Sequence, residues 1–226
     1  MEIPLLLAVP AVMAAALLAG VEQAALAMLV VVALVLALFF AGYEASRPGL
    51  RQIMPTLVLA ALAAAGRILF GPIPDFKPVS AIAIIAGATL GRRNGFMVGA
   101  LAALTSNFFF GQGMWTPWQM FCMGIIGFLA GVLFRKGLLR RTRGSLCVFG
   151  VFSAIVIYGG IMNPASVLMW ANADALTWKT VLTYYVTGFP MDCVQASATV
   201  FFLLIAAEPM LEKLDRIKVK YGMMEL

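Results

Sequence analysis

The chain has 226 residues, of which 63% are hydrophobic and only 12% are charged, and its formal net charge is +6. Soluble domains are about 45–50% apolar and about 25% charged, so this composition excludes a soluble globular protein and indicates an integral membrane protein. The sequence holds no histidine, which excludes histidine-based catalysis, most zinc sites and histidine-ligated haem. The cysteines Cys122, Cys147 and Cys193 stand in apolar surroundings without paired spacing, so we expect neither a disulfide framework nor a metal site.

Apolar runs between charged residues and Gly/Pro breaks predict eight membrane-spanning helices, an all-α integral membrane fold. The first two predict a retained transmembrane hairpin over residues 1–46, because Glu2 rather than a basic leader precedes them. Residues 47–226 then form a six-helix core with a basic tail. The fourth segment is short for a span, which needs about 20 residues, so we expect it to tilt or to be shielded by its neighbours. The predicted segments are 3–20, 23–43, 53–70, 79–90, 95–110, 115–134, 146–170 and 181–207.

The positive charges predict the orientation of the chain. Thirteen of the 16 Lys and Arg residues fall on one side of the predicted spans, and only Arg67, Lys77 and Lys179 fall on the other. The positive-inside rule places the larger group, and with it both termini, in the cytoplasm. The net charge therefore requires no nucleic-acid partner. The larger group is Arg47, Arg51, Arg92, Arg93, Arg135, Lys136, Arg140, Arg141, Arg143, Lys213, Arg216, Lys218 and Lys220.

The predicted outer connections differ from the short, basic inner ones. Residues 70–78, residues 107–120 and the segment after Asn163-Pro164 are rich in Pro, Gly, Trp and amides. Irregular backbone near a membrane is tolerated where it is buried in protein or lines a wet cavity. The outward half of the protein is therefore predicted to hold a cavity under these loops.

Two charged residues lie within predicted spans on the outer side. Asp192 stands in the last span, where an ionised residue usually faces a cavity or a partner. It would either contact a ligand or gate, or form a structural pair with Arg67. Arg67 would extend to the lipid headgroups, pair with Asp192, or hold an anionic group of a ligand.

A set of amides and aromatics around the second outer loop suits an uncharged, flat, polar ligand. Trp115 and Trp118 share a face if a helix has begun there, and Pro117 suits a first turn. Trp at an interface is also common as part of an aromatic belt. The predicted substrate-binding residues are Arg67, Asn107, Gln112, Trp115, Trp118, Gln119, Asn163 and Asp192.

Small residues pattern the third span, where Ala60/Ala64 and Ala61/Ala65 are four residues apart. Such pairs allow close helix packing, either within the protein or against another membrane subunit. No nucleotide-binding loop, no Ser/His pair and no paired intramembrane carboxylates occur in the sequence. We therefore expect no enzyme activity, no cofactor and no metal.

Residues 53–207 resemble the substrate-binding (S) component of energy-coupling factor (ECF) vitamin transporters. The resemblance rests on the Ala60/Ala64 span, residues 76–87, residues 95–120 with Trp115-Thr116-Pro117-Trp118-Gln119, and Pro190-Met191-Asp192. It implies a six-helix core that captures a vitamin-like small molecule from the outer side. It also implies docking, through Ala60 and Ala64, on a membrane coupling subunit powered by two ATPase subunits.

Two features depart from the family pattern. Related sequences tend to place a His after the Asp of the last span, whereas Gln195 stands there in this chain. The N-terminal hairpin adds two helices to the usual six, and either packs laterally or contacts a partner or lipid.

The Trp-Thr-Pro-Trp-Gln segment resembles most the sequences assigned to cobalamin or related corrinoids, so a corrinoid is the predicted substrate. Flavins, queuosine-type bases and other vitamins also stack on aromatic side chains, so the chemistry of the segment leaves them open. Two other classes remain open. One is a self-sufficient secondary carrier or channel, which inverted repeats would favour. The other is a membrane scaffold without a ligand, in which the site residues only pack.

Overall fold

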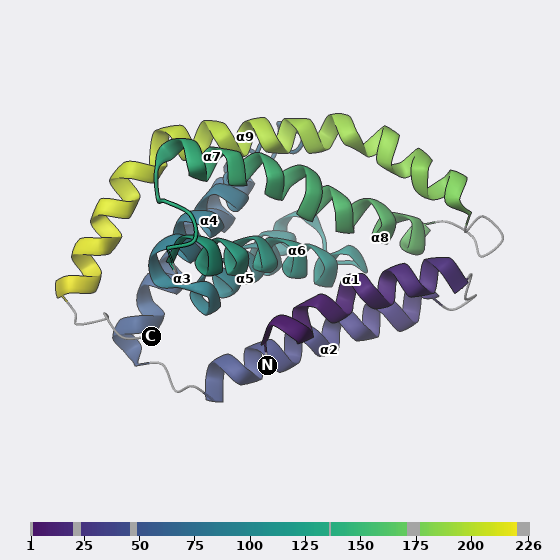
Figure 1. The fold of residues 1–226 in the computed structure, drawn as a ribbon, viewed down its shortest axis with the longest axis horizontal. Helices are drawn as coiled ribbons and strands as arrows, with labels where there is room; N and C mark the ends of the chain where they lie inside the picture. Colours follow the sequence, from purple (N-terminus) through teal and green to yellow (C-terminus); the bar gives the residue numbers. More distant parts are fainter. Residues whose placement is uncertain (1, 20–23, 46–48, 136, 171–176, 221–226) are drawn as a thin grey trace.

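The computed structural model describes all residues except 1, 20–23, 46–48, 136, 171–176 and 221–226, and the described residues are helical with no strand (Figure 1). Two stretches, Gly131–Arg135 and Ser153–Gly159, are π-helical and continue α6 and α7. The α-helices are α1 Glu2–Ala19, α2 Ala24–Ala45, α3 Leu50–Leu69, α4 Val79–Leu90, α5 Arg92–Phe110, α6 Trp115–Ala130, α7 Arg143–Phe152, α8 Gly160–Trp170 and α9 Trp178–Lys220.

The helices coincide with the eight predicted apolar segments, because α7 and α8 form one continuous helical stretch over Arg143–Trp170. The largest difference is at the end of the chain, where α9 continues 13 residues beyond the predicted end at 207. Ion pairs one turn apart, Arg216–Glu212 and Lys218–Asp215, support this charged extension. The extension turns away from the rest of α9 (Figure 1), and Pro209 lies in that part of the helix.

Four helical stretches are long and apolar enough to cross a membrane: Met28–Ala45, Trp115–Arg135, Arg143–Trp170 and Trp178–Lys220. Three shorter apolar helices accompany them, at Leu6–Ala15, Ile53–Leu69 and Val79–Leu90. The protein is therefore a multi-pass helical membrane protein. The orientation of its termini stays a prediction, and two of the cations behind it, Arg47 and Lys136, lie outside the described residues.

Helix α4 occupies the centre of the molecule, and all 12 of its residues are buried. Its neighbours are α3, α5, α6 and α9. The expectation that neighbours shield this short segment is confirmed. Because the other helices surround α4, it does not have to be long enough to span the lipid by itself.

Glycines let three backbones meet at this centre. A Cβ added at Gly87 of α4 would overlap the carbonyl oxygen of Gly127 in α6, and one added at Gly127 would overlap the carbonyl oxygen of Gly95 in α5. Helices packed this closely gain dispersion contacts along their whole length. The group α4–α5–α6 is therefore the rigid frame on which the other helices pack.

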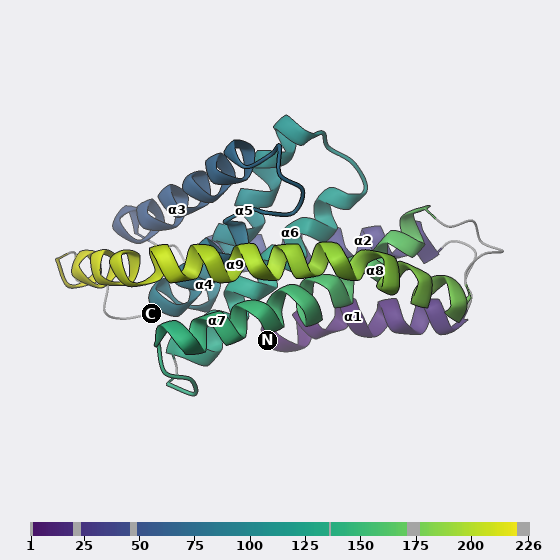
Figure 2. The same ribbon diagram turned by 90° about the horizontal axis from the view of Figure 1, so that it is seen from above.

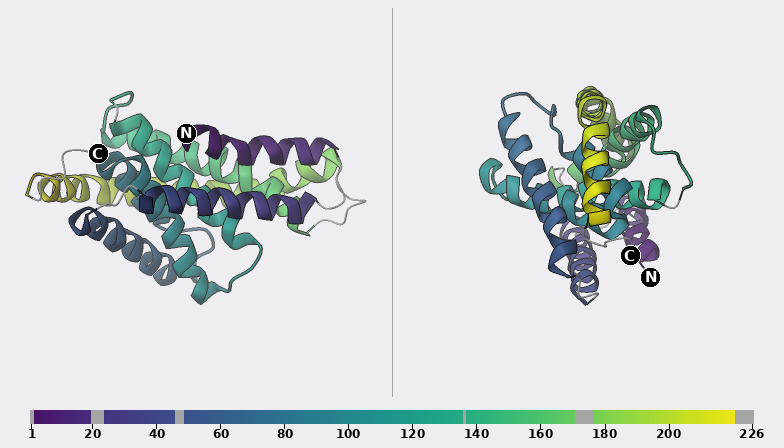
Figure 3. Two further views of the ribbon diagram at one scale, coloured as in Figure 1. Left: turned by 90° about the horizontal axis from the view of Figure 1, so that it is seen from below. Right: turned by 90° about the vertical axis from the view of Figure 1, so that its left-hand side faces the viewer.

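The hairpin α1–α2 packs on this frame through α2, which contacts α6 and α8. The Phe39 ring stacks on Phe96 with centroids 3.8 Å apart and meets Phe128 edge-on. The Tyr43 hydroxyl donates to Asn94 Oδ1 over 3.0 Å. Figures 2 and 3 show α1 and α3 at different edges of the molecule, so the hairpin leaves the outward side of α3 uncovered.

Candidate functional site

Arg67, near the C-terminal end of α3, organises a polar network inside the helix bundle. Its guanidinium donates to Ser106 Oγ and Asn107 Oδ1 over 2.6 Å each, and to Gln119 Oε1 over 3.2 Å. No carboxylate of a described residue forms an ion pair with Arg67. The cation is therefore held by neutral oxygens from α5 and α6, and Asp75 attracts it without forming an ion pair.

The network continues through the amides that join α5 to α6. Asn107, which is 1% exposed, donates from Nδ2 to Gln119 Oε1 over 2.9 Å and to Thr116 Oγ1 over 3.2 Å. Thr116 donates to Gln112 Oε1 over 2.9 Å, and Gln112 Nε2 donates to the carbonyl oxygen of Leu104. Of the set predicted around the second outer loop, Asn107, Gln112 and Gln119 share this network, to which Arg67 also belongs, and their role in binding a substrate stays a prediction.

A small cavity of about 50 Å³ adjoins this network. Its wall is mostly polar or charged, unlike the surrounding helices, and combines cations, a carboxylate, amides and hydroxyls. Sites for small molecules are usually about 300–1,000 Å³, so the site is closed in this structure. The lining residues are Arg67, Asp75, Lys77, Val79, Ser80, Gln119, Met123, Tyr158 and Gln195.

The loop between α3 and α4 supplies two of these residues, Asp75 and Lys77. Burial lowers the pKa of the Lys77 ammonium, and Asp75 opposes this shift. The loop is fastened to α9 through aromatic rings, because Phe76 contacts both Phe201 and Phe202. Phe70, at the start of the loop, meets Phe202 edge-on at 5.1 Å.

Asp192 and Asn163 form a pair of their own. Asn163 Nδ2 donates to Asp192 Oδ2 over 2.9 Å, and Asp192 is 7% exposed. The carboxylate lies against the backbone of Gly159, at the end of the π-helical stretch Ser153–Gly159. The alternative of an Arg67–Asp192 ion pair is wrong, because Arg67 bonds only neutral oxygens among the described residues. Asp192 is one turn from Gln195, which lines the cavity.

The two tryptophans have different surroundings. Trp118 is 1% exposed and packs in the core. Trp115 is half-buried and stacks on Trp170 of α8, with centroids 6.2 Å apart. Neither lines the cavity. Helix α6 does begin at Trp115, with Pro117 in its first turn as expected.

Of the lining residues, sequence reasoning predicted only Arg67 and Gln119, and it missed Asp75, Lys77, Val79, Ser80, Met123, Tyr158 and Gln195. Gln195 Nε2 donates to Ser80 Oγ over 3.3 Å, and Ser80 donates to Met123 Sδ over 3.5 Å. A single serine or tyrosine in an apolar helix gives no signal of its own. Gln195 did give a signal, because it stands at the position where relatives tend to carry a His.

The comparisons with known proteins identify the family. Residues 49–214 match the model of the ECF-type riboflavin transporter S component. The chain belongs to this family. No curated protein and no solved structure matches the chain. As an S component, the chain is the substrate-capturing subunit of an ECF transporter, a transport role rather than an enzymatic one.

Two expectations about this S component need revision. The preference for a corrinoid gains no support, because the family description names riboflavin. The docking face on Ala60 and Ala64 meets a structural obstacle, since these residues are only 5% and 2% exposed. They pack inward, where α3 contacts α5 and α4. The open side of α3 carries Ala61 and Ala65 instead.

Proposed function

We propose that this S component captures riboflavin, or a closely related flavin, in the site between Arg67, Gln119 and Gln195 and passes it to a coupling subunit. The observation that carries the proposal is a cation without an ion-pair partner among the described residues, in a polar site inside the stretch that matches the riboflavin family. Riboflavin has no net charge, but its ring system presents carbonyl oxygens and ring nitrogens along one edge.

The donors around the cavity suit that edge. Arg67 presents a fixed fork of N–H groups, and Gln119, Gln195 and Ser80 can each donate or accept. The fused rings would contact Tyr158 and Met123, both of which favour flat aromatic partners. Asp75 and Lys77, which also line the cavity, would contact the ribityl hydroxyls.

Binding requires the cavity to open. A volume of about 50 Å³ is far below the usual size of a small-molecule site. The segment between α3 and α4, residues 70–78, is the covering element with the fewest helical hydrogen bonds, so we propose that it moves when the ligand enters. The frame α4–α5–α6 stays in place because glycine contacts lock it.

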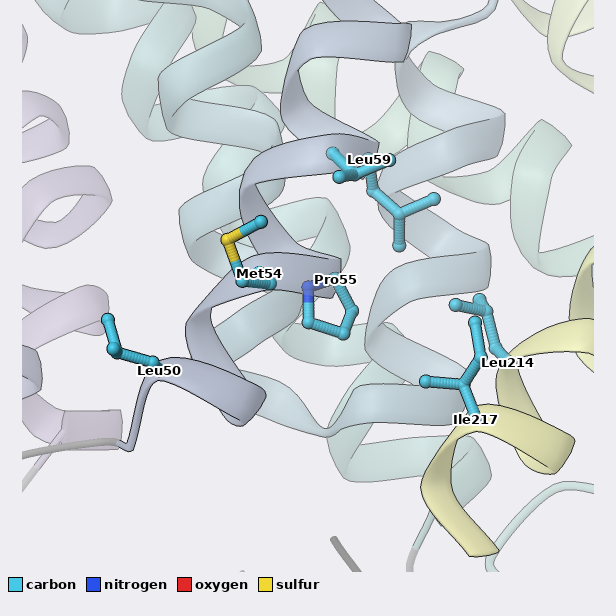
Figure 4. Close-up of a pocket in the computed structure, with 7 residues that line it drawn as sticks. Leu50, Met54, Pro55, Leu59, Leu214 and Ile217 are labelled. Carbon is cyan, nitrogen blue, oxygen red and sulfur yellow. The ribbon is translucent and has the colours of Figure 1, made fainter. Parts of the chain in front are cut away.

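We propose that the coupling subunit docks on the open side of α3. Leu57, Val58 and Leu62 there are 47–59% exposed, and Ala61 and Ala65 lie among them. An apolar groove of about 430 Å³ continues this surface toward the end of α9 (Figure 4). The groove is lined by Leu50, Met54, Pro55, Val58, Leu59, Leu214 and Ile217.

Ligand binding is tested by thermal melting of the purified chain with riboflavin, flavin mononucleotide and cobalamin. A ligand at 100 times its Kd stabilises the protein by about 2.7 kcal/mol, so riboflavin is expected to raise the melting temperature by several degrees. Cobalamin is expected to leave it unchanged. A shift with cobalamin alone would overturn the flavin assignment in favour of a corrinoid. No shift with any of the three would favour a scaffold without a ligand.

The proposed setting is the plasma membrane of a bacterium, with both termini in the cytoplasm. Single cysteines at Gly144 and Lys179, labelled from outside intact cells, test this orientation. Only the cysteine at Lys179 is expected to react with an impermeant reagent.

A further inference from the structure

The ring of Phe110, the last residue of α5, lies against two cations at once. The Arg67 guanidinium carbon is 5.2 Å from the ring centroid, and the Lys77 ammonium nitrogen is 5.8 Å from it. Both distances are within the range of cation–π attraction. Arg67 and Lys77 belong to opposite ends of the α3–α4 connection, so one ring fastens both ends of that segment.

Backbone packing adds a third contact. A Cβ added at Gly71 would lie 3.1 Å from two atoms of the Phe110 ring and 2.9 Å from the carbonyl oxygen of Ile68. The second residue after α3, Gly71, therefore rests directly on the ring. Phe110 thus touches the beginning of the connection at Gly71 and its end at Lys77.

Arg67 is also held by its three hydrogen bonds to neutral oxygens, so the ring is the contact that the two cations share rather than the main support of either. Among the described residues, no carboxylate forms an ion pair with Arg67 or Lys77. Two like charges on one ring repel each other, and the Asp75 carboxylate on the same cavity wall and the electron-rich face of Phe110 both oppose this repulsion. Both cations line the closed cavity.

We propose that Phe110 is an aromatic latch that holds the α3–α4 connection over the cavity, and that an aromatic ligand enters by taking Arg67 and Lys77 from it. This inference rests on the proposed function for the identity of the ligand, but the latch itself exists without one. Because an electron-rich ring or carbonyl edge competes best for the two cations, the latch selects ligands of that chemistry. Aliphatic solutes would leave it closed.

The sequence supplies its own matched control, because Phe108, Phe109 and Phe110 are consecutive. Phe108 and Phe109 are 74% and 71% exposed, against 44% for Phe110. No ring contact or cation–π contact of Phe108 or Phe109 is found with the described residues. Phe109→Leu therefore makes the same chemical change one residue away without touching the latch.

The test measures access to the cavity with no ligand present. Ser80, which is 1% exposed and lines the cavity, is replaced by Cys. The purified chain is treated with a water-soluble maleimide, and labelling at residue 80 is followed by mass spectrometry of its peptide, so the native cysteines do not interfere. Phe110→Leu is expected to speed labelling about three- to tenfold, as the loss of one or two cation–π contacts would. Phe109→Leu and Phe110→Tyr are expected to label at the same rate as the parent chain.

Equal labelling rates in Phe110→Leu and Phe109→Leu would overturn the latch. If Phe110→Leu does not fold, Lys77→Met takes its place, because it removes one cation and keeps the ring. Lys77→Met is expected to label faster than the parent, and an unchanged rate would equally overturn the latch. A chain that shows the expected labelling but binds no riboflavin would refute the flavin assignment and leave the latch standing.

Discussion

Arg67 shows how one charged side chain can organise a site in an apolar bundle. A cation within a membrane span costs about 2.5–3.5 kcal/mol on insertion scales. Hydrogen bonds to a charged group contribute about 1.5–3 kcal/mol each, so three neutral oxygens, on Ser106, Asn107 and Gln119, can offset this cost. The guanidinium then keeps its charge and remains available to a ligand.

Removing this charge should weaken riboflavin binding. Arg67→Gln is expected to raise the Kd at least about tenfold, because it removes donors aimed at the ring edge. Arg67→Lys keeps a positive charge but loses the planar set of N–H donors, so its Kd for riboflavin is expected to lie between that of Arg67→Gln and that of the parent chain. Quenching of riboflavin fluorescence on titration with the purified chain measures all three. The exposed Lys179→Gln is the control, and a Kd in Arg67→Gln equal to that of this control would argue against the site.

Asp192 makes a different kind of contribution, which is to stability. Asp192→Asn keeps a partner for Asn163 and removes a buried charge, so we expect an unchanged or higher melting temperature. Asp192→Leu leaves Asn163 Nδ2 unpaired, at a cost of about 1–3 kcal/mol, and should lower the melting temperature by several degrees. Circular dichroism on heating distinguishes the two variants. Equal melting temperatures would show that the hydrogen bond between these residues is unimportant.

At the scale of the helices, the glycine contacts among α4, α5 and α6 make a sharp prediction. Gly87→Ala would force its new methyl group into the carbonyl of Gly127, and overpacking of this kind costs about 1–3 kcal/mol or more. Gly42→Ala in α2 meets nothing within 4 Å and should gain up to about 1 kcal/mol from helix propensity. The melting temperature should therefore fall in Gly87→Ala and rise slightly in Gly42→Ala. A stable Gly87→Ala protein would contradict the locked frame.

The open side of α3 can be tested separately from ligand binding. Ala61→Trp and Ala65→Trp add bulk where the structure leaves α3 uncovered, so we expect normal riboflavin binding and a transport rate reduced at least about tenfold. Leu34→Trp, at a position that is 57% exposed on α2, is the control for bulk on a lipid-facing helix. Normal transport by both α3 variants would place the docking surface elsewhere.

The sequence predicted the helices well, because each apolar segment is bounded by a strong break. Residues 79–90 agree at both ends with α4, where Pro78 and Gly91 flank the run. The end of α9 was missed because its last 13 residues are charged, and their helix depends on ion pairs and on Leu214, which is buried.

The site was predicted only in part. Amides that cluster along the chain, such as Asn107 and Gln119, could be recognised from spacing alone. The inward-facing side of α3 could not be predicted from the sequence. Ala60 and Ala61 are the same residue type, and only packing against α5 distinguishes them. The partners of Arg67 and Asp192 likewise depend on how helices distant in sequence come together, for which one sequence carries no signal.

At the scale of the whole molecule, the chain is a glycine-packed frame on which the other helices pack. Helix α3 and the α3–α4 connection lie on one side of the frame, and the N-terminal hairpin packs on α6 and α8. The cavity and the docking surface both involve α3. Movement of α3 is therefore a direct way for a partner to sense whether the site is filled.

The most direct test of the central claim is riboflavin uptake into proteoliposomes. The chain is reconstituted alone, or together with the coupling subunit and two ATPase subunits of an ECF transporter, with ATP supplied on the side of the ATPases. We predict that riboflavin is taken up only by the complete assembly, and that Arg67→Gln abolishes this uptake without preventing assembly. Uptake by the chain alone would contradict the account, and so would full uptake by the Arg67→Gln assembly.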